Sequence, residues 1–486
     1  MLLAASTLSH FNRRQIRLRY RFITVIATAL AVVLLQPLPF YGKDANSVKR
    51  PNIVLILADD LGYGDLGCYG HATFRTPRLD RLAAEGARLT QFNTPMPYCA
   101  PTRASLLTGR YPFRHGLMGN PAPDGAPQYD KLGLDTSAVL LPQMLRSAGY
   151  ATACIGKWHL GHQPQFMPQR RGFDFYLGIP YSNDMRPVKL FADDRAVEYP
   201  VVQANLTQRY TDRAIEFIRQ NREQPFFLYL AHAMPHKPLA VSERYYHRHS
   251  DTLYADTLAE LDANIGQLLD TLDELKLSDN TIVLFTSDNG PWYGGSSGGL
   301  RGMKSMTWEG GYRVPLLARW PNKIPAGHTS AALAGMIDLA PTLLKATQID
   351  APTGVTFDGR DLWPVLTYST ASPHEALIGS SGKEPANIRD QRWKLHVKAP
   401  GKPPVSATLP GRWIDPRGPD GVTILAPYEQ YQPTVFTGPQ TGVESRDGLL
   451  FDLQADPSEQ HDLSAQHPGE VERLGRLFTR LTAPAP

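Results

Sequence analysis

The chain has 486 residues, of which 42% are hydrophobic and 20% are charged, with 42 prolines and 40 glycines. This composition is that of a globular protein and excludes a fibrous or low-complexity chain. The formal net charge is +4, but residues 1–42 hold five arginines and no acidic residue. The rest of the chain has 45 basic and 46 acidic residues, which argues against a general nucleic-acid-binding surface. We therefore expect no nucleic-acid partner.

Residues 1–42 resemble an export signal. Their arginines precede an apolar run of 14 residues, 22–35, and two prolines follow it. A basic segment, a short apolar segment and helix breakers are typical of secretion signals. A membrane-spanning helix needs about 20 apolar residues, more than this run supplies. We predict an exported protein, periplasmic or secreted, that contacts a membrane only if this segment is kept as an N-terminal anchor.

Five apolar runs predict the buried strands of a sheet. They lie at residues 52–58, 152–155, 226–230, 281–286 and 314–318. None alternates polar with apolar residues, which is typical of parallel strands covered by helices on both faces. An apolar stripe at helical spacing along residues 258–272 predicts one such helix, packed on the core. The alternation of strands and helices indicates a layered α/β domain, which we place at residues 43–365.

The pattern changes after residue 365. Shorter strands at 376–379, 393–397 and 449–453, followed by a helix at 469–481, predict a smaller C-terminal subdomain over residues 366–486. Its sheet is expected to be antiparallel. Residues 399–446 are rich in proline, glycine and threonine, so we expect a long loop there, at the substrate entrance.

Polar residues directly follow four of the predicted strands. They are Asp59, Asp60, Lys157, His159, His236, Asp288 and Asn289. One such strand ending is usually a turn or a helix cap, but the carboxyl ends of parallel strands meet at one edge of a sheet. Four such endings therefore predict one shared site. Its oxygen donors favour Ca²⁺ or Mg²⁺ over zinc, and adjacent carboxylates would repel each other without a cation.

Cys99 lies at the predicted start of a helix. Pro101 suits the first turn of that helix, and Gly109 suits its end. Backbone amides and the helix dipole at this position favour an anion, and Arg103 lies one helical turn further on. These features indicate an activated cysteine beside a cation. The alternative is a capped surface helix with a buried thiol.

Residues 99–110, Cys-Ala-Pro-Thr-Arg-Ala-Ser-Leu-Leu-Thr-Gly-Arg, resemble the signature of the formylglycine-dependent (type I) sulfatase family. Further matching segments follow the family's order, at residues 51–65, 156–161, 235–238, 287–290, 302–304, 308–315, 392–395 and 450–459. The resemblance covers roughly residues 51–465. Residues 178–184 resemble the arylsulfatase A and N-acetylgalactosamine-6-sulfatase branch, in which the residue at the position of Ser182 contacts the sulfate.

The resemblance implies an α/β fold of the alkaline-phosphatase-like type. In this fold a central, mostly parallel sheet is flanked by helices, and a smaller C-terminal antiparallel sheet with a helix follows. It also implies that a maturation enzyme, the formylglycine-generating enzyme, oxidises Cys99 to Cα-formylglycine. One Ca²⁺ per chain would then be held by Asp59, Asp60, Asp288, Asn289 and the converted Cys99.

The same resemblance assigns the remaining roles. Arg103 and Lys157 would hold the formylglycine, whose hydrate attacks sulfur. His236 and Lys304 would bind the sulfate and protonate the leaving oxygen. His159 would remove the proton from the second hydroxyl, which expels sulfate and restores the aldehyde.

We therefore predict a sulfuric ester hydrolase that acts on a sulfated sugar or glycan, or on an aryl sulfate. Two alternatives stay open at this point. One is a phosphate or phosphonate monoester hydrolase of the same superfold. The other is a non-catalytic binding protein in which Cys99 is never converted.

Overall fold

The structure is a computed structural model that describes residues 50–246, 248, 252–292, 294–402 and 438–484. The predicted export signal and most of the predicted loop 399–446 lie outside the described residues. Among the described helices, none combines the length and the apolarity that a bilayer crossing requires.

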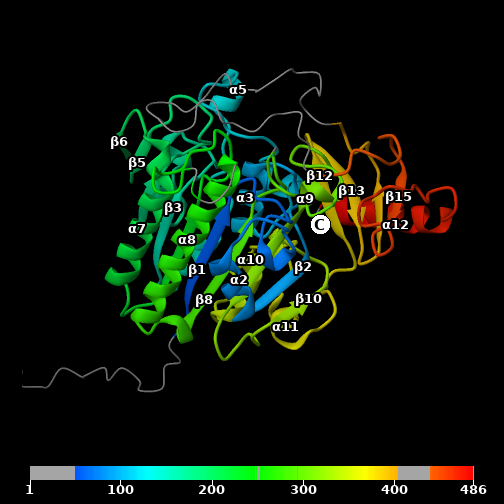
Figure 1. Cartoon of the computed structure of the whole chain (residues 1–486). Helices are drawn as coiled ribbons and strands as arrows, with labels where there is room; N and C mark the ends of the chain where they lie inside the picture. Colours follow the sequence, from blue (N-terminus) through cyan, green and yellow to red (C-terminus); the bar gives the residue numbers. More distant parts are fainter. Residues whose placement is uncertain (1–49, 247, 249–251, 293, 403–437, 485–486) are drawn as a thin grey trace, which may run out of the picture. The chain divides into compact units, whose positions relative to one another are not determined.

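The larger sheet contains all five predicted strands (Figure 1). At its centre, β1 (Asn52–Ala58) lies between β7 (Phe226–Ala231) and β8 (Thr281–Ser287) and runs parallel to both. β3 (Ala151–Gly156) pairs with β7, also in parallel. The fifth strand, β9 (Arg313–Arg319), is antiparallel to β8. The sheet is therefore mostly parallel, and the carboxyl ends of β1, β3, β7 and β8 share one edge.

The outer strands are short or partly polar, and the apolar pattern did not predict them. They are β2 (Ala87–Asn93), β4 (Phe175–Gly178), β5 (Leu190–Ala192), β6 (Arg195–Glu198), β10 (His328–Ser330) and β11 (Ala334–Gly335). The strand order is β10-β2-β9-β8-β1-β7-β3-β4-β5-β6, with β11 also paired to β2.

Helices cover both faces of this sheet. Successive side chains of β1 point to opposite sides, so each face of the strand packs on a different set of helices. Val54 and Ile56 pack with α2 (Pro77–Ala84), α7 (Leu206–Gln220) and α8 (Leu253–Glu274). The other face packs on α3 (Cys99–Thr108), α6 (Leu141–Ser147), α10 (Leu339–Ala346) and α11 (Trp363–Tyr368). The predicted apolar stripe at 258–272 is buried in α8, as expected. These layers confirm the predicted α/β architecture.

Short helical turns connect these elements. They are η1 (Gly67–Tyr69), α4 (Pro112–His115), α5 (Pro127–Asp130), η2 (Pro164–Phe166), η3 (Pro168–Arg171), η4 (Gln203–Asn205), η5 (Ser278–Asn280), α9 (Glu309–Tyr312) and η6 (Met336–Asp338).

A second, antiparallel sheet of four strands forms the C-terminal part, shown in yellow to red in Figure 1. Its strands are β12 (Leu377–Ser381), β13 (Glu384–Arg389), β14 (Trp393–His396) and β15 (Leu449–Asp452), and α12 (Pro468–Thr482) follows them. Three of the strands and the helix match the predicted elements. The pattern missed β13 because it contains Pro385, which lies next to a register shift in the pairing with β12. The predicted domain boundary near residue 365 stays a prediction.

Candidate active site

Acidic residues from two neighbouring strands meet at the edge of the larger sheet. Asp59 and Asp60 follow β1, and Asp288 and Asn289 follow the parallel strand β8. The backbone N–H of Asp60 donates to Oδ1 of Asp288 at 3.2 Å, and Nδ2 of Asn289 donates to Oδ1 of Asp60 at 2.7 Å. Asp60 has a φ of 62°, a left-handed conformation that is uncommon for a residue other than glycine. The structure thus brings together the four residues expected from the strand ends.

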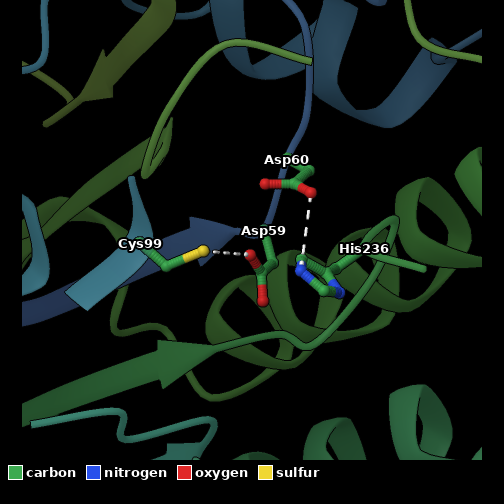
Figure 2. A group of neighbouring side chains, drawn as sticks. All are labelled: Asp59, Asp60, Cys99 and His236. Atoms are coloured by element: carbon green, nitrogen blue, oxygen red, sulfur yellow. Dashed lines mark hydrogen bonds and ion pairs between the residues drawn. The ribbon is translucent and has the colours of Figure 1, made fainter. Parts of the chain in front are cut away.

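Helix α3 presents Cys99 to these carboxylates. Cys99 is its first residue, and Gly109 ends it with a φ of 65°, as predicted. The Cys99 Sγ lies 3.4 Å from Oδ1 of Asp59, toward which it points in Figure 2. Asn120 supports this helix start, because its Oδ1 accepts the backbone N–H of Ala100 at 3.1 Å. No sequence pattern pointed to Asn120, because it lies in a loop without periodicity.

Arg103 and Lys157 are fully buried against the carboxylates. The Nε and a terminal nitrogen of Arg103 both lie 2.9 Å from Oδ2 of Asp288, and the terminal nitrogen is 3.5 Å from Oδ2 of Asp59. Arg103 also donates to the backbone carbonyl of Lys157 at 2.8 Å. The ammonium of Lys157 forms an ion pair with Asp59. Both predicted cations therefore contact the acidic residues directly.

Lys304 reaches the same group from a distant segment of the chain. Its Nζ lies 2.6 and 2.8 Å from the two carboxylate oxygens of Asp60, and 3.3 Å from the Sγ of Cys99. Its backbone N–H donates to the carbonyl of Pro291 at 2.9 Å. Three buried cations, Arg103, Lys157 and Lys304, thus face three buried carboxylates around one cysteine.

His236 and Ser182 border the same site, next to Asp60 and Lys157. The Nε2 of His236 lies 3.6 Å from Oδ2 of Asp60 and 3.5 Å from Oγ of Ser182, and Lys157 donates to the same Oγ at 3.0 Å. The Nδ1 of His236 contacts the carbonyl of Lys237. Because a carbonyl only accepts, Nδ1 carries the proton and Nε2 faces the site as an acceptor. Figure 2 shows this ring turned toward Asp60.

His159 is buried near the cations, in a left-handed backbone conformation with a φ of 62°. Its Nε2 lies 3.2 Å from the carbonyl of Pro121, so Nε2 donates. Its Nδ1 has no hydrogen-bond partner among the described residues. Burial and the charge of Lys157 lower the pKa of His159 well below its usual value. The ring is therefore neutral, with one free acceptor nitrogen.

Burial gives the carboxylates of this site different pKa values. It raises the pKa of Asp59 to about 7, with Asp288 adding to the effect, and it also raises the pKa of Asp60. Burial acts on Asp288 as well, but Arg103 and Lys157 hold the pKa of that carboxyl below its usual value. Unequal pKa values in one cluster are typical of functional sites.

The prediction of an activated cysteine is wrong for the unmodified thiol. Burial, followed by the charges of Asp288 and Asp59, raises the pKa of Cys99 well above its usual value. The helix start and the nearby lysines do not offset these effects, so the thiol is neutral. A neutral, buried thiol is a poor nucleophile and a poor metal ligand.

The site has the donors to hold a metal ion. Ligand atoms of Asp59, Asp60, Cys99 and His236 all lie within 4.8 Å of one another. Oδ1 of Asn289 is buried and has no hydrogen-bond partner in the described structure, so it is free to bind a cation. The strand-end pattern had placed His236 at this edge of the sheet, and the fold brings its ring close to Asp60. The Asp288 carboxylate lies outside this close group and is engaged by Arg103.

Comparisons with known proteins identify this arrangement. A model of the Sulfatase family matches residues 51–349. The chain belongs to the sulfatase family. As a family member it is a sulfuric ester hydrolase, and the strand-end residues described above all lie within the matched region.

Two sulfatases similar to this chain are mammalian. Arylsulfatase G of Mus musculus is 39% identical over 379 residues, which cover 68% of this chain and 71% of the relative. N-acetylgalactosamine-6-sulfatase of Homo sapiens is 41% identical over 348 residues, which cover 66% of this chain and 67% of the relative. These relatives belong to the branch expected from residues 178–184.

Solved structures share the fold of this sulfatase. One is a structure described under the metabolism of multiple glycosaminoglycans by Bacteroides thetaiotaomicron. It superposes with a TM-score of 0.74 at 27% identity, and the match covers 89% of this chain and 99% of the other chain. Another is Ps i-CgsB in complex with k-i-k-neocarrahexaose, with a TM-score of 0.72 at 27% identity. The match covers 89% of this chain and 92% of the other chain. The predicted alkaline-phosphatase-like fold is confirmed.

Proposed function

We propose that this sulfatase removes sulfate from a sulfated sugar or glycan, using Cα-formylglycine made from Cys99 and one Ca²⁺. The observation that carries the proposal is the position of Cys99. Its side chain lies at a helix start, between Asp59 and Lys304, in a site where an unmodified thiol stays neutral. In the converted protein, a hydrated aldehyde would supply an oxygen nucleophile, and the cation would neutralise charge on the sulfuryl oxygens.

The buried charges support the binding of a divalent cation together with an anion. Three carboxylates already balance three cations, so a divalent ion alone would leave two uncompensated positive charges in a buried site. The sulfate ester of a substrate brings one negative charge and the sulfate product brings two, so the ester offsets half of this charge and the product offsets all of it. Asp59, Asp60, Asn289 and Asp288, with the converted Cys99, are the residues we propose to hold the ion.

The proposed sulfate position is bordered by Lys304, His236 and Ser182. Burial opposes the charge of Lys304, but the Asp60 carboxylate raises the pKa of the ammonium well above its usual value. Burial and Lys304 lower the pKa of His236 well below its usual value. Lys304 is therefore the group that holds a proton for the leaving oxygen. The Ser182 hydroxyl accepts a hydrogen bond from Lys157, and we propose that it contacts a sulfate oxygen.

His159 is suited to the role of proton acceptor. Its free Nδ1 and lowered pKa leave a neutral acceptor beside Arg103 and Lys157. In the proposed site, Arg103 and Lys157 would hold the oxygens of the converted Cys99. His159 would accept a proton at Nδ1 from one of these hydroxyl oxygens.

The carbohydrate class of the substrate rests on the relatives. One is named N-acetylgalactosamine-6-sulfatase, and one solved structure is a complex with k-i-k-neocarrahexaose. A pocket of about 290 Å³ adjoins the segment that carries Lys304, and its lining includes Met303, Met306 and Trp308. We propose that the unsulfated part of the substrate enters beside this segment.

The proposal includes export and maturation. The N-terminal residues 1–42 would direct the chain to the periplasm or the exterior, or anchor it in a membrane. A formylglycine-generating enzyme would convert Cys99.

Two measurements test the proposal. Peptide mass spectrometry of active protein should find residue 99 as the aldehyde, and defined sulfated mono- and oligosaccharides should release sulfate. Phosphate and phosphonate esters on the same aglycones should turn over far more slowly. Full activity from wholly unmodified Cys99 would contradict the formylglycine mechanism, and a preference for the phosphorus esters would favour the alternative hydrolase.

A further inference from the structure

Three segments that match family motifs place no side chain in the site described above, yet they meet elsewhere. They are 308–315, 392–395 and 450–459. Four of their ionic residues, together with Arg389 and His396 from neighbouring positions, form one cluster, here named the Glu309 cluster. It consists of Glu309, Arg313, Arg389, Lys394, His396 and Glu459, and none is more than 7% exposed.

Two carboxylates organise the Glu309 cluster. Oε2 of Glu309 lies 2.6 Å from Arg313 and 2.7 Å from Arg389, and its Oε1 lies 3.1 Å from Lys394. Glu459 pairs with the same Lys394 at 3.2 Å. Burial opposes ionisation, but these cations hold the pKa of both glutamates below the usual value. The cluster therefore joins the larger sheet to the C-terminal sheet through ionised, paired groups.

Glu459 also holds the two ends of the segment that carries Lys304. At one end, its carboxylate accepts the backbone N–H of Glu309 at 2.6 Å. At the other end, its backbone carbonyl accepts from Arg301 at 3.0 Å. The Arg301 guanidinium stacks on Trp308, 3.8 Å from the ring centre. One residue of the C-terminal sheet region thus fixes both sides of residues 301–309.

The middle of this segment turns sharply to deliver Lys304. Ser305 has a φ of 74°, and its N–H donates to the carbonyl of Pro97 at 3.0 Å. Thr307 donates to the carbonyl of Pro400 at 2.9 Å. A turn of this kind persists only where its surroundings hold it. The position of the Lys304 ammonium on Asp60 therefore depends on the anchors at both ends.

We infer that Glu459 is a positioning residue that acts through Lys304, so that the C-terminal sheet is part of the apparatus that binds sulfate. This inference rests on the proposed function, which places Lys304 against the substrate sulfate. The residue itself lies outside the site and contacts no reacting atom. A displacement of about 1 Å at a catalytic group can cost on the order of a hundredfold in rate.

A double-mutant cycle tests the inference. Four full-length, converted proteins are compared: wild type, Glu459→Gln, Lys304→Met and the double variant. Turnover of 4-nitrophenyl sulfate gives kcat/KM, and calorimetry gives the Kd of inorganic sulfate, which needs no turnover. With Lys304 present, we expect Glu459→Gln to lower kcat/KM about 10- to 100-fold and to raise the Kd roughly tenfold. In the Lys304→Met background, the same change should alter the Kd less than about twofold.

Asp452→Asn is the matched control. Asp452 lies in β15, and its carboxylate pairs with Arg392 at 2.7 Å rather than with a residue of the Lys304 segment. It should change thermal stability but neither kcat/KM nor sulfate affinity. If Glu459→Gln does not fold, Arg301→Gln removes the other anchor and enters the same cycle.

The outcomes separate the two proposals. Equal effects of Glu459→Gln with and without Lys304 would mean a merely structural role and would overturn the inference alone. Wild-type sulfate binding and turnover in Lys304→Met would instead overturn the role that the proposed function gives to Lys304.

Discussion

Two buried ionic clusters in this sulfatase, the site around Cys99 and the Glu309 cluster, use the same residue types to different ends. In the Glu309 cluster, both glutamates are paired and the pKa of each is lowered. In the site, the pKa of Asp59 is raised to about 7, and an amide oxygen of Asn289 has no hydrogen-bond partner in the described structure. In the first cluster all carboxylate oxygens are paired, and Nδ1 of His396 is the one buried side-chain atom without a hydrogen-bond partner in the described structure, whereas the second keeps an unpaired oxygen on Asn289 beside its carboxylates. An unpaired oxygen donor, rather than burial or charge itself, therefore distinguishes the functional cluster.

The largest effect is expected at Cys99. Cys99→Ala should lower turnover of sulfate esters by roughly a thousandfold or more, because it removes the only side chain proposed to become the nucleophile. Steady-state kinetics measure the loss, and thermal unfolding should stay close to that of wild type. Cys68→Ala, at a free and half-buried cysteine, is the control and should retain activity. An active Cys99→Ala protein would refute the role of this residue.

Loss of a carboxylate from the Glu309 cluster should act mainly on stability. Glu309→Gln leaves Arg313, Arg389 and Lys394 buried without their shared partner. We expect the free energy of unfolding to fall by about 3–5 kcal/mol, measured by denaturant titration. Glu384→Gln, at the exposed pair with Lys398, should leave it unchanged. A Glu309→Gln protein as stable as wild type would show that the ion pairs of this cluster do not contribute to the free energy of unfolding.

The raised pKa of Asp59 predicts a pH dependence of the metal-free protein. Between the usual Asp pKa of about 4 and the folded value of about 7, the folded state keeps a proton that the unfolded state has lost. The free energy of unfolding should therefore fall as pH rises across this range, by a few kcal/mol (order of magnitude).

Asp59→Asn should remove the part of this slope that Asp59 contributes, while the raised pKa values of Asp60 and Asp65 leave a smaller slope of the same sign. Asp270→Asn, at an exposed ion pair, should leave the slope unchanged. Ca²⁺ should stabilise the wild type more at the high end of the range, because it binds the ionised carboxylate. Denaturation of chelator-treated protein with and without Ca²⁺ or Zn²⁺ measures both effects. An unchanged slope in Asp59→Asn would assign the titration to another group, and stabilisation by Zn²⁺ alone would argue against Ca²⁺.

The smallest effect is expected at Ser182. Ser182→Ala removes one hydroxyl near His236 and leaves Lys157 paired with Asp59. We expect a loss of about tenfold in kcat/KM, mainly through a higher KM, since tenfold corresponds to about 1.4 kcal/mol and a hydrogen bond to a charged group is worth about 1.5–3 kcal/mol. Ser137→Ala, at an exposed serine outside the site, is the control. A loss as large as that of Cys99→Ala would place Ser182 in the chemistry itself.

The sequence alone predicted much of the catalytic edge. Apolar runs identified β1, β3, β7 and β8, and the residues after them are those that meet in the structure. Helix signals at Pro101 and Gly109 located α3. These features are local: strand burial, helix caps and turn residues act over a few positions. Short or polar strands such as β13 have no such pattern, and tertiary pairing alone forms them.

Only the tertiary structure decided the chemical state of the site. Local rules indicated an activated thiol at Cys99, but burial beside Asp288 and Asp59 keeps it neutral. The strand-end pattern placed His236 at the shared edge, but only the fold shows that its Nε2 lies 3.6 Å from Asp60. Likewise, Glu459 reaches the Lys304 segment from 155 positions further along the chain. Which residues meet at the edge of the sheet was readable from sequence order, whereas their charge, partners and anchors depend on distances in space, because desolvation and Coulomb interactions act through space.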